Sequence, residues 1–279
     1  MTVNLCAIFQ ASQKITCFRN EDIISAMSSS QKNQSPTVSI IIPTLNEESS
    51  IGQTLDALTK ISKPLEVIVV DGGSSDKTVQ IVRKSNVKLI AARRGRGAQL
   101  HAGACIAQGE TFWFLHADTI VPTDARQRIA DALLDPQVIA GNFDVRFDGR
   151  GGAARFMTWL YPQLRRLGLS YGDSAIFVRR EAYNQIGGFQ PFPIFEDLDL
   201  IKRLRKQGRV AHLPDLVVTS SRRFEGRSFA VTFARWASLQ VLYWLGVKPS
   251  TLARFYTAIR EAPGQVERVD LGLSEGRKL

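Results

Sequence analysis

Short apolar runs alternate with stretches of helical periodicity along the first part of the chain. The runs are Val38–Ile42, Leu65–Val70, Val87–Ala92 and Thr111–Asp118. Strands separated by single helices predict right-handed crossovers and parallel pairing. The sequence therefore predicts an α/β fold with a mostly parallel central sheet flanked by helices.

Acidic residues stand where these predicted elements begin or end. Asp71 closes the second strand, Asp118 closes the fourth, and Glu196 and Asp197 open a helix with apolar spacing over 198–204. Ligands of open α/β sheets bind at the carboxyl ends of the strands, so we expect these carboxylates to share one crevice. Carboxylates there suit a divalent cation, a phosphorylated ligand and a general base, which points to transfer chemistry on a nucleotide-activated substrate.

The chain divides into four predicted parts. Residues 1–36 are rich in Ser, Gln and Asn and predict a disordered extension, 37–225 a catalytic domain, 226–262 amphipathic or apolar helices, and 263–279 a tail. Within the second part, strands are expected at 138–147, 174–181 and 216–221, and a helix at 124–134. Three cysteines with no CxxC spacing make a reducing cytoplasm the expected location.

The carboxyl-terminal third holds most of the basic charge. Twelve Lys or Arg between Lys202 and Arg260 face only Asp215 and Glu225, a surplus of +10 that equals the net charge of the whole protein. This charge favours either a solvated surface or contact with an anionic membrane or phosphorylated ligand. No motif supports nucleic-acid binding.

The apolar stretch 229–247 lies within this basic region. A lone Arg235 inside it argues against a membrane span. A buried helix is the favoured interpretation, with a dimer contact or a membrane-interface helix as alternatives.

Two loops have the residues of a nucleotide site. Pro43 is expected to end the first strand, and Thr44, Asn46 and Glu47 after it offer hydrogen-bonding groups; a helix-capping loop is the alternative. Asp71 is followed by two glycines that allow close approach of a flat ligand, although the G-x-G-x-x-G fingerprint of dinucleotide sites is missing.

A third loop and two acidic positions complete the candidates. Arg94 and Gly95 precede a helix, where guanidinium and backbone N–H groups suit a diphosphate, although a solvated basic loop is the alternative. Asp118 could bind Mg²⁺ or Mn²⁺ or merely cap a turn. Asp197 could act as a general base with Glu196 beside it, whereas acidic residues also favour a helix start for electrostatic reasons.

Four segments in this order resemble the family-2 glycosyltransferases of GT-A fold. They are PTLNEE (43–48), VVDGGSSD (69–76), LHAD (115–118) and FEDLD (195–199), and the resemblance covers about residues 38–225. The segments GRGAQLHAGA, FLHADT and GDSAIFVRREAYNQIGGF are similar to a bacterial subgroup that includes diaponeurosporenoate-type carotenoid glycosyltransferases.

The resemblance implies a role for each matching residue. Pro43, Thr44, Glu47 and Asp71 would hold the uridine part of a UDP-sugar, and Asp197 would be the base of an inverting displacement. Asp118 would be the metal-binding Asp of the D-x-D element, whose first Asp is His116 here, so that His116 would orient a water or phosphate. Arg223, in an Arg-Arg-Phe element, would lie over the diphosphate.

The expected function is transfer of a sugar from a nucleotide-sugar donor to a hydroxyl or carboxyl acceptor, including lipid or isoprenoid acceptors. A carboxylate acceptor would make Asp197 less critical, because it already lacks its proton. A nucleotidyltransferase or other NDP-sugar enzyme is one alternative. A non-catalytic module that binds anionic membranes is another, and both enzyme and module would work in the cytoplasm or on the inner face of the cell membrane.

Overall fold

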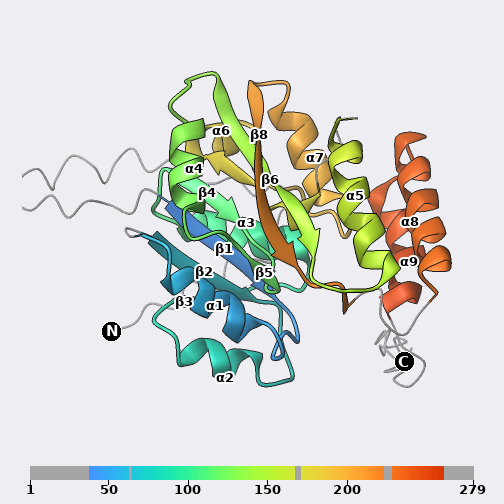
Figure 1. Cartoon of the computed structure of the whole chain (residues 1–279), viewed down its shortest axis with the longest axis horizontal. Helices are drawn as coiled ribbons and strands as arrows, with labels where there is room; N and C mark the ends of the chain where they lie inside the picture. Colours follow the sequence, from blue (N-terminus) through green and yellow to red (C-terminus); the bar gives the residue numbers. More distant parts are fainter. Residues whose placement is uncertain (1–37, 63–64, 167–170, 223–227, 261–279) are drawn as a thin grey trace, which may run out of the picture.

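A computed structural model describes residues 38–62, 65–166, 171–222 and 228–260 (Figure 1). Its centre is an eight-stranded sheet of order β3-β2-β1-β4-β7-β6-β8-β5 with helices on both faces. The predicted extension 1–36 and tail 263–279 lie outside the described residues.

The first half of the sheet is parallel, as the sequence predicts. Its strands are β1 (Val38–Thr44), β2 (Leu65–Asp71), β3 (Lys88–Ala91) and β4 (Thr111–Phe114), connected by α1 (Ile51–Thr59), α2 (Thr78–Arg83) and α3 (Arg96–Ile106). β1 pairs in parallel with both β2 and β4, so it lies in the middle of this half. The β1 and β2 ends therefore point to the same edge, with Thr44 opposite Asp71.

Alternation along β1 places its side chains in two separate cores. Ile40 and Ile42 pack into the cluster that contains α1, whereas Ile41 packs into the cluster that contains α3. All three are fully buried, which stabilises the fold by about 1.5–3 kcal/mol for each side chain. α3 lies so close to the sheet that a Cβ on Gly103 would come within 2.5 Å of Ile41 Cγ2.

The prediction that Pro43 ends the first strand is wrong. β1 continues through Pro43 to Thr44, in register with Val70 and Asp71 of β2. A proline lacks the N–H of a ladder bond and is tolerated where one side of the strand has no partner. Pairing of β1 with β4 stops at Ile41, so Pro43 has a partner strand on one side only.

The second half of the sheet is mixed. β7 (Phe177–Arg179) is antiparallel to both β4 and β6 (Val138–Phe147), β6 is parallel to β8 (Arg209–Thr219), and β5 (Thr119–Ile120) is antiparallel to β8. The remaining elements are α4 (Ala125–Ala132), η2 (Gly172–Ser174), α6 (Arg180–Gln185) and α7 (Glu196–Leu204).

β6 has the predicted bounds. Its alternating pattern fits an exposed or an antiparallel strand, and β6 is antiparallel to β7 and mostly buried between β7 and β8. β8 begins at Arg209, whereas the sequence predicted a strand start at Leu216. Residues in the 209–216 stretch pair with β6 although none of them is buried and Pro214 interrupts their pattern.

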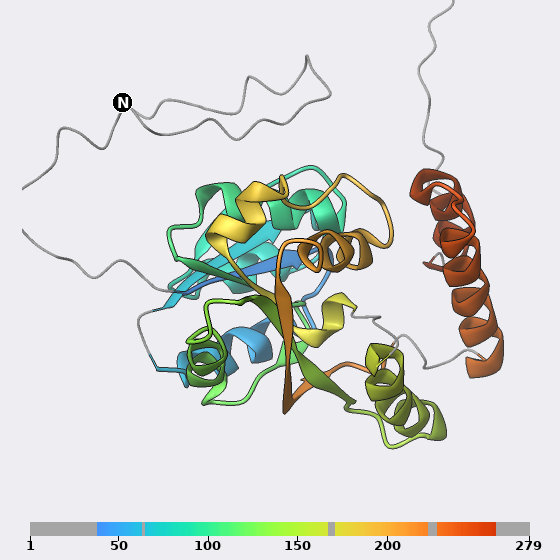
Figure 2. The same cartoon turned by 90° about the horizontal axis from the view of Figure 1, so that it is seen from above.

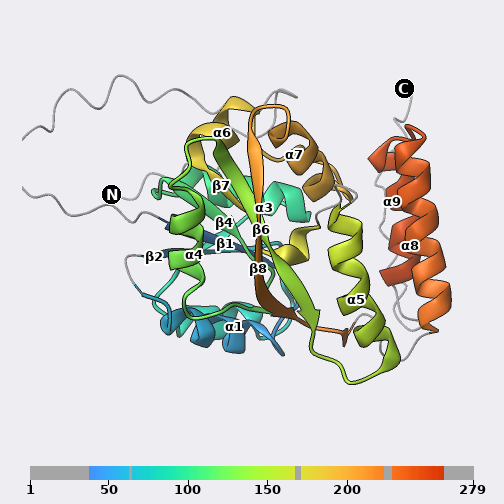
Figure 3. The same ribbon diagram turned by 45° about the horizontal axis from the view of Figure 1, so that its top comes forward.

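Three helices form a separate layer beside the second half. α5 (Gly152–Arg166) lies next to the sheet, and α8 (Phe229–Trp244) and α9 (Pro249–Arg260) lie side by side beyond it (Figures 1 and 3). From above, α8 and α9 stand at the rim of the molecule (Figure 2). Only Leu239 and Gln240 of α8 are buried, so the expected buried helix is buried along one stripe. Among the described residues, no helix has the length and apolar character needed to cross a membrane.

Candidate functional site

Asp71 organises the loop that follows β2. Its Oδ1 accepts a hydrogen bond from Thr44 Oγ1 at 3.2 Å, and its Oδ2 accepts the backbone N–H groups of Gly73 and Ser74, each at 2.9 Å. Ser74 Oγ donates to the same carboxylate. Asp71 is buried, and a carboxylate that accepts this many bonds fixes the shape of its loop.

The loop after β1 is tied to the loop after β2. Asn46 has a left-handed φ of 56° and its Oδ1 accepts the N–H of Ser75 at 2.8 Å. The backbone N–H of Glu47 donates to Thr78 Oγ1 at 2.7 Å. The two loops that sequence analysis assigned to a nucleotide therefore form one connected surface at the edge of the parallel sheet.

Gln99 of α3 supports this edge from behind. Its Nε2 donates to the carbonyl oxygens of Thr44 and Val70, both at 2.8 Å, and the side chain is buried. Sequence reasoning did not single out Gln99. A polar residue among the small and apolar residues of a buried helix was the available signal.

Arg222 connects the first loop to the predicted metal ligand. Its Nη2 lies 2.9 Å from Glu47 Oε2 and 3.7 Å from the carboxylate of Asp118. Asp118 also accepts a hydrogen bond from Thr219 Oγ1 at 3.4 Å. The predicted donor residue Arg223 lies outside the described residues, whereas Arg222, the first residue of the same Arg-Arg-Phe element, contacts Glu47 and Asp118.

The sequence predicted that Asp118 closes the fourth strand, but in the structure it does not. β4 ends at Phe114, and the last ladder-like contact is the bond from Leu115 N–H to the carbonyl of Ile41. His116 and Asp118 therefore lie on the turn between β4 and β5.

The residues present fit a Mg²⁺ or Mn²⁺ ion only as a shared site. Within the described part of the chain, no group of three or more His, Cys, Asp or Glu side chains could hold a metal by itself. Magnesium sites with one or two carboxylates are completed by substrate phosphates and water. Asp118 is one such carboxylate.

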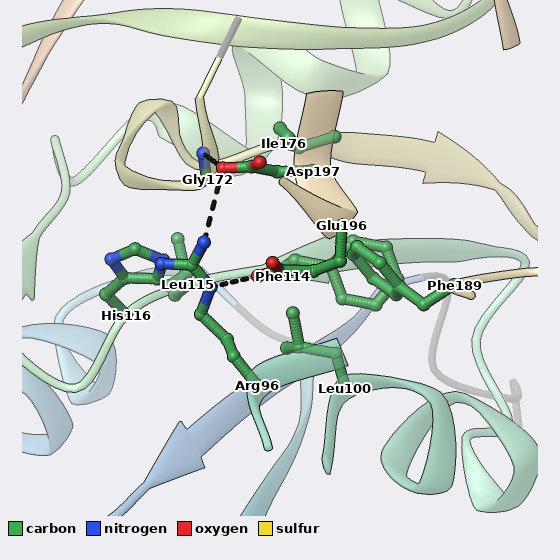
Figure 4. Close-up of a pocket in the computed structure, with 10 residues that line it drawn as sticks. All are labelled: Arg96, Leu100, Phe114, Leu115, His116, Gly172, Ile176, Phe189, Glu196 and Asp197. Atoms are coloured by element: carbon green, nitrogen blue, oxygen red, sulfur yellow. Dashed lines mark hydrogen bonds and ion pairs between the residues drawn. The ribbon is translucent and has the colours of Figure 1, made fainter. Parts of the chain in front are cut away.

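The predicted catalytic pair, Glu196 and Asp197, is buried at the start of α7, where sequence analysis placed it. Glu196 is 1% exposed and Asp197 5% exposed, and the preceding Phe195 adopts a left-handed φ of 63° that turns the chain into the helix. Arg96, at the start of α3, forms an ion pair with Glu196 and lies 3.5 Å from Asp197 (Figure 4).

Two backbone groups fix the Asp197 carboxylate. Gly172 N–H donates to Oδ2 at 2.6 Å, and Leu198 N–H donates to Oδ1 at 2.8 Å. Burial and, next, the nearby Glu196 carboxylate raise the pKa of Asp197, and Arg96 and the Gly172 N–H oppose the shift; the balance is a pKa of about 6. A carboxylate with a pKa near 6 is ionised at neutral pH and still basic enough to accept a proton.

His116 lines the same pocket as the pair (Figure 4). A Cβ on Gly172 would lie 2.9 Å from His116 Nε2 and 3.3 Å from Asp197 Oδ2, so these two side chains close on the glycine. His116 is two residues from Asp118, and it thus connects the predicted metal ligand to the predicted base.

The loop before α3 contributes Arg96 to the pocket, and the diphosphate role of Arg94 stays a prediction. Arg94 is exposed, and Gly95 starts α3 with a φ of 138° and directs its N–H toward Gln99 Oε1 at 3.4 Å. Arg96 is the member of this loop that reaches the catalytic pair. The glycines around it in Gly95-Arg96-Gly97 were the signal, since a Cβ on Gly97 would lie 3.2 Å from Glu196 Cβ.

Residues 39–187 match the model of Glycosyl transferase family 2. The chain belongs to this family. The match includes both nucleotide loops, Asp118 and Gly172, and it ends before the catalytic pair.

Curated and solved relatives agree with this family. A beta-monoglucosyldiacylglycerol synthase of Synechocystis sp. is 31% identical over 193 residues, which are 61% of this chain and 40% of that protein. This chain thus spans about two-fifths of that relative's length.

The fold agrees with solved glycosyltransferases. The mannosyltransferase PcManGT from Pyrobaculum calidifontis, solved with GDP-Man and Mn²⁺, has a TM-score of 0.58 and 25% identity, over 84% of this chain and 67% of that chain. TarS 1-349 of S. aureus, solved with UDP-GlcNAc, has a TM-score of 0.53 and 22% identity, over 70% of this chain and 60% of that chain. These likenesses confirm the predicted GT-A fold.

The predicted site residues fall into two connected groups. Thr44, Asn46, Glu47 and Asp71 form the nucleotide edge, which Arg222 joins to Asp118. His116, Glu196 and Asp197 form the pocket around Gly172, held by Arg96. Arg222 thus contacts Glu47 and Asp118 in the first group, Arg96 contacts Glu196 and Asp197 in the second, and Asp71 is not part of the pocket that Asp197 lines.

Proposed function

We propose that this protein transfers a sugar from a UDP-sugar to an acceptor hydroxyl. The observation that carries the proposal is the buried Asp197, whose pKa is raised to about 6 and which lines a pocket together with His116. The solved relatives named above carry nucleotide sugars in this fold. Asp71, Thr44, Asn46 and Glu47 would bind the uridine part, and Pro43 would shape the loop.

The diphosphate would lie between the two arginine-linked groups. Asp118 would hold a Mg²⁺ or Mn²⁺ ion together with phosphate oxygens, and this ion would neutralise charge on the leaving diphosphate. Arg222 would exchange its contacts with Glu47 and Asp118 for phosphate oxygens, and Arg94 and the Gly95 N–H would approach from the loop before α3. Arg223 follows Arg222 directly and would add a second guanidinium.

Asp197 would act as the general base of a single displacement. Its carboxylate takes the proton of the acceptor hydroxyl while the acceptor oxygen bonds to the anomeric carbon. The bond between that carbon and the diphosphate breaks at the same time, its electron pair leaves with the diphosphate, and the anomeric configuration inverts. Arg96 would pair with Glu196 beside the base, and the Gly172 N–H would hold Asp197 in line.

We propose further that the acceptor is a lipid and that the protein works at an anionic membrane surface. The relative from Synechocystis is by name a synthase of a glucosyl lipid. In this chain, α5, α8 and α9 contain no Asp or Glu and carry exposed Arg155, Arg235 and Arg254.

Large apolar side chains accompany this charge. Trp159 is 61% exposed, Trp244 59%, Leu245 74% and Phe255 62%; these four residues are the apolar surface referred to below. Exposed aromatic and basic side chains on adjacent helices are typical of interfacial membrane binding.

The proposal is tested by UDP release and UDP binding. Purified protein is incubated with a panel of UDP-sugars and GDP-mannose, with and without Mn²⁺, in the presence of mixed lipid vesicles. We expect UDP release from one sugar, dependent on Mn²⁺ and lost in Asp197→Asn. Absence of both UDP release and UDP binding would refute the donor class, and release of pyrophosphate from UTP would favour the nucleotidyltransferase alternative.

A further inference from the structure

Gln240 is a buried amide with an unused donor. Its side chain lies in α8 and is 3% exposed, and its Oε1 accepts a hydrogen bond from Tyr171 Oη at 3.2 Å. Its Nε2 has no hydrogen-bond partner within the described residues. An unpaired buried donor costs about 1–3 kcal/mol, so a residue of this kind calls for a functional explanation.

The state of Tyr171 determines which end of the amide is unused. Burial raises the pKa of Tyr171, and the carboxylates of Asp197 and Asp173 raise it further. The phenol therefore keeps its proton at neutral pH and donates it to Gln240 Oε1. This bond orients the amide and leaves Nε2 without a partner among the described residues, enclosed between α8 and the segment around Tyr171.

The same face of α8 contacts both segments that hold the catalytic pair. Trp236 lies one turn before Gln240 and its ring is 5.1 Å from that of Tyr171, the residue before Gly172. Tyr243 lies about one turn after Gln240 and its ring stacks at 4.9 Å on Phe195, the residue before Glu196. Burial raises the pKa of Tyr243, and the charges of Asp199 and Asp197 contribute, so the base and this face of α8 are close.

We propose that α8 forms one wall of the acceptor site and that Gln240 binds and orients an amphiphilic acceptor, a lipid with a free hydroxyl, beside Asp197. This inference rests on the proposed glycosyl transfer. Nε2 would donate to an oxygen of the lipid head, while Trp236 and Tyr243 contact its apolar part. The apolar chain of the lipid would then run along α8 toward Trp244, which is exposed on this helix, and Leu245, which is exposed directly after it.

Alternative uses of this face fit less well. The amide of Gln99 has both ends paired, because its Nε2 donates to two carbonyl oxygens and its Oε1 accepts the N–H of Gly95, whereas the Nε2 of Gln240 is unpaired among the described residues. A purely polar acceptor such as a free sugar would not use the aromatic side chains of Trp236 and Tyr243 on either side of Gln240. The combination of one unused donor, aromatic neighbours and exposed apolar side chains favours a lipid.

The test compares Gln240→Leu and Gln240→Glu with Ser238→Ala. Leu keeps most of the volume but removes the donor, Glu keeps the shape but replaces the donor with an acceptor, and Ser238 is an exposed polar residue of the same helix. Binding of 1,2-dioleoylglycerol in neutral detergent micelles is followed by tryptophan fluorescence in the presence of UDP, and UDP affinity is titrated separately.

We expect both Gln240 variants to bind dioleoylglycerol at least about tenfold more weakly, the loss expected for one buried hydrogen bond of about 1.4 kcal/mol. UDP affinity should stay near wild type in both Gln240 variants, and Ser238→Ala should match wild type throughout. Unchanged lipid binding in either Gln240 variant, equal losses of lipid and UDP affinity, or no lipid binding by wild type that still binds UDP would each overturn the inference. Failure of wild type to bind UDP would instead refute the proposed function itself.

Discussion

Gly172 donates its backbone N–H to the Asp197 carboxylate over 2.6 Å, and the two residues come from different elements, η2 and α7. The bond is possible because Gly172 has no side chain between His116 and Asp197. A backbone donor cannot rotate away as a side chain can, so it holds the proposed base in one orientation.

Gly172→Ala should therefore lower kcat while donor binding stays intact. The new Cβ would lie 2.9 Å from His116 Nε2 and 3.3 Å from Asp197 Oδ2, which forces one of them to shift. A displaced general base is expected to cost about 10²-fold in rate. Turnover of the UDP-sugar that gives UDP release in the panel measures the effect on kcat, and UDP affinity measures the effect on donor binding. Gly151→Ala, where a Cβ meets nothing within 4 Å, is the control, and equal kcat values for the two variants would contradict the role of Gly172.

The pH dependence of kcat should report Asp197. The pKa of this carboxyl is raised to about 6, so the base is protonated and inactive below pH 6 and ionised above it. The rate should rise with pH, half-maximal near pH 6, and then level off. Asp197→Asn should lose about 10²- to 10⁴-fold in rate together with this limb. Near-normal turnover of the variant would indicate that the acceptor is already ionised, as a carboxylate is.

Asp118→Asn should remove the effect of divalent metal on donor binding. The variant keeps the shape of the side chain and its bond with Thr219 but loses the charge that a cation needs. We expect Mn²⁺ to raise UDP affinity in wild type and to leave it unchanged in the variant, as measured by calorimetry. A variant that retains the wild-type response to Mn²⁺ would place the metal elsewhere.

Arg222→Ala should weaken UDP binding about tenfold or more, because a hydrogen bond between charged groups contributes about 1.5–3 kcal/mol. Its guanidinium pairs with Glu47 and Asp118 in this structure, and it would be placed to donate hydrogen bonds to the diphosphate. Arg128→Ala removes an exposed guanidinium on α4 that pairs with Asp124, and it should leave UDP affinity unchanged. Equal affinities in the two variants would exclude a donor role for Arg222.

Trp159→Ser combined with Trp244→Ser should weaken binding to anionic vesicles. Both rings are exposed on helices that carry basic and no acidic residues, so they are placed to enter the interface between lipid head groups and chains. Co-sedimentation with vesicles at low salt should fall at least about fivefold relative to wild type. Leu134→Ser, at an 80% exposed apolar position after α4, is the control. Equal loss in the control would show that general surface hydrophobicity is responsible.

The parallel half of the fold was predictable because its signals are local. The apolar runs of β1 and β2 are each continuous, and each crossover contains one helix. The strands are parallel, so their carboxyl ends lie together at one edge of the sheet. Asp71 and the Glu196-Asp197 pair could be placed for the same reason, since a strand end and a helix start are both visible in sequence.

The rest depends on contacts between distant residues. Arg96 and Arg94 are alike in sequence, and only the approach of α7 to α3 decides which of them reaches Glu196. Gln240 is oriented by a hydrogen bond from Tyr171, which lies 69 residues away in the sequence. The predicted strand was shorter than β8, because the first half of β8 is held by pairing with β6 and its own sequence pattern does not indicate a strand.

The two arginine connections run in opposite directions along the chain. Arg96 lies before β5 in the chain and pairs with Glu196 after it, whereas Arg222 lies after β5 and pairs with Glu47 before it. A recombination event between β5 and α4 would separate both pairs at once. Among descendants that exchange the part after β5, positions 96 and 196 should therefore change together, as should positions 47 and 222, even where the surrounding loops diverge freely.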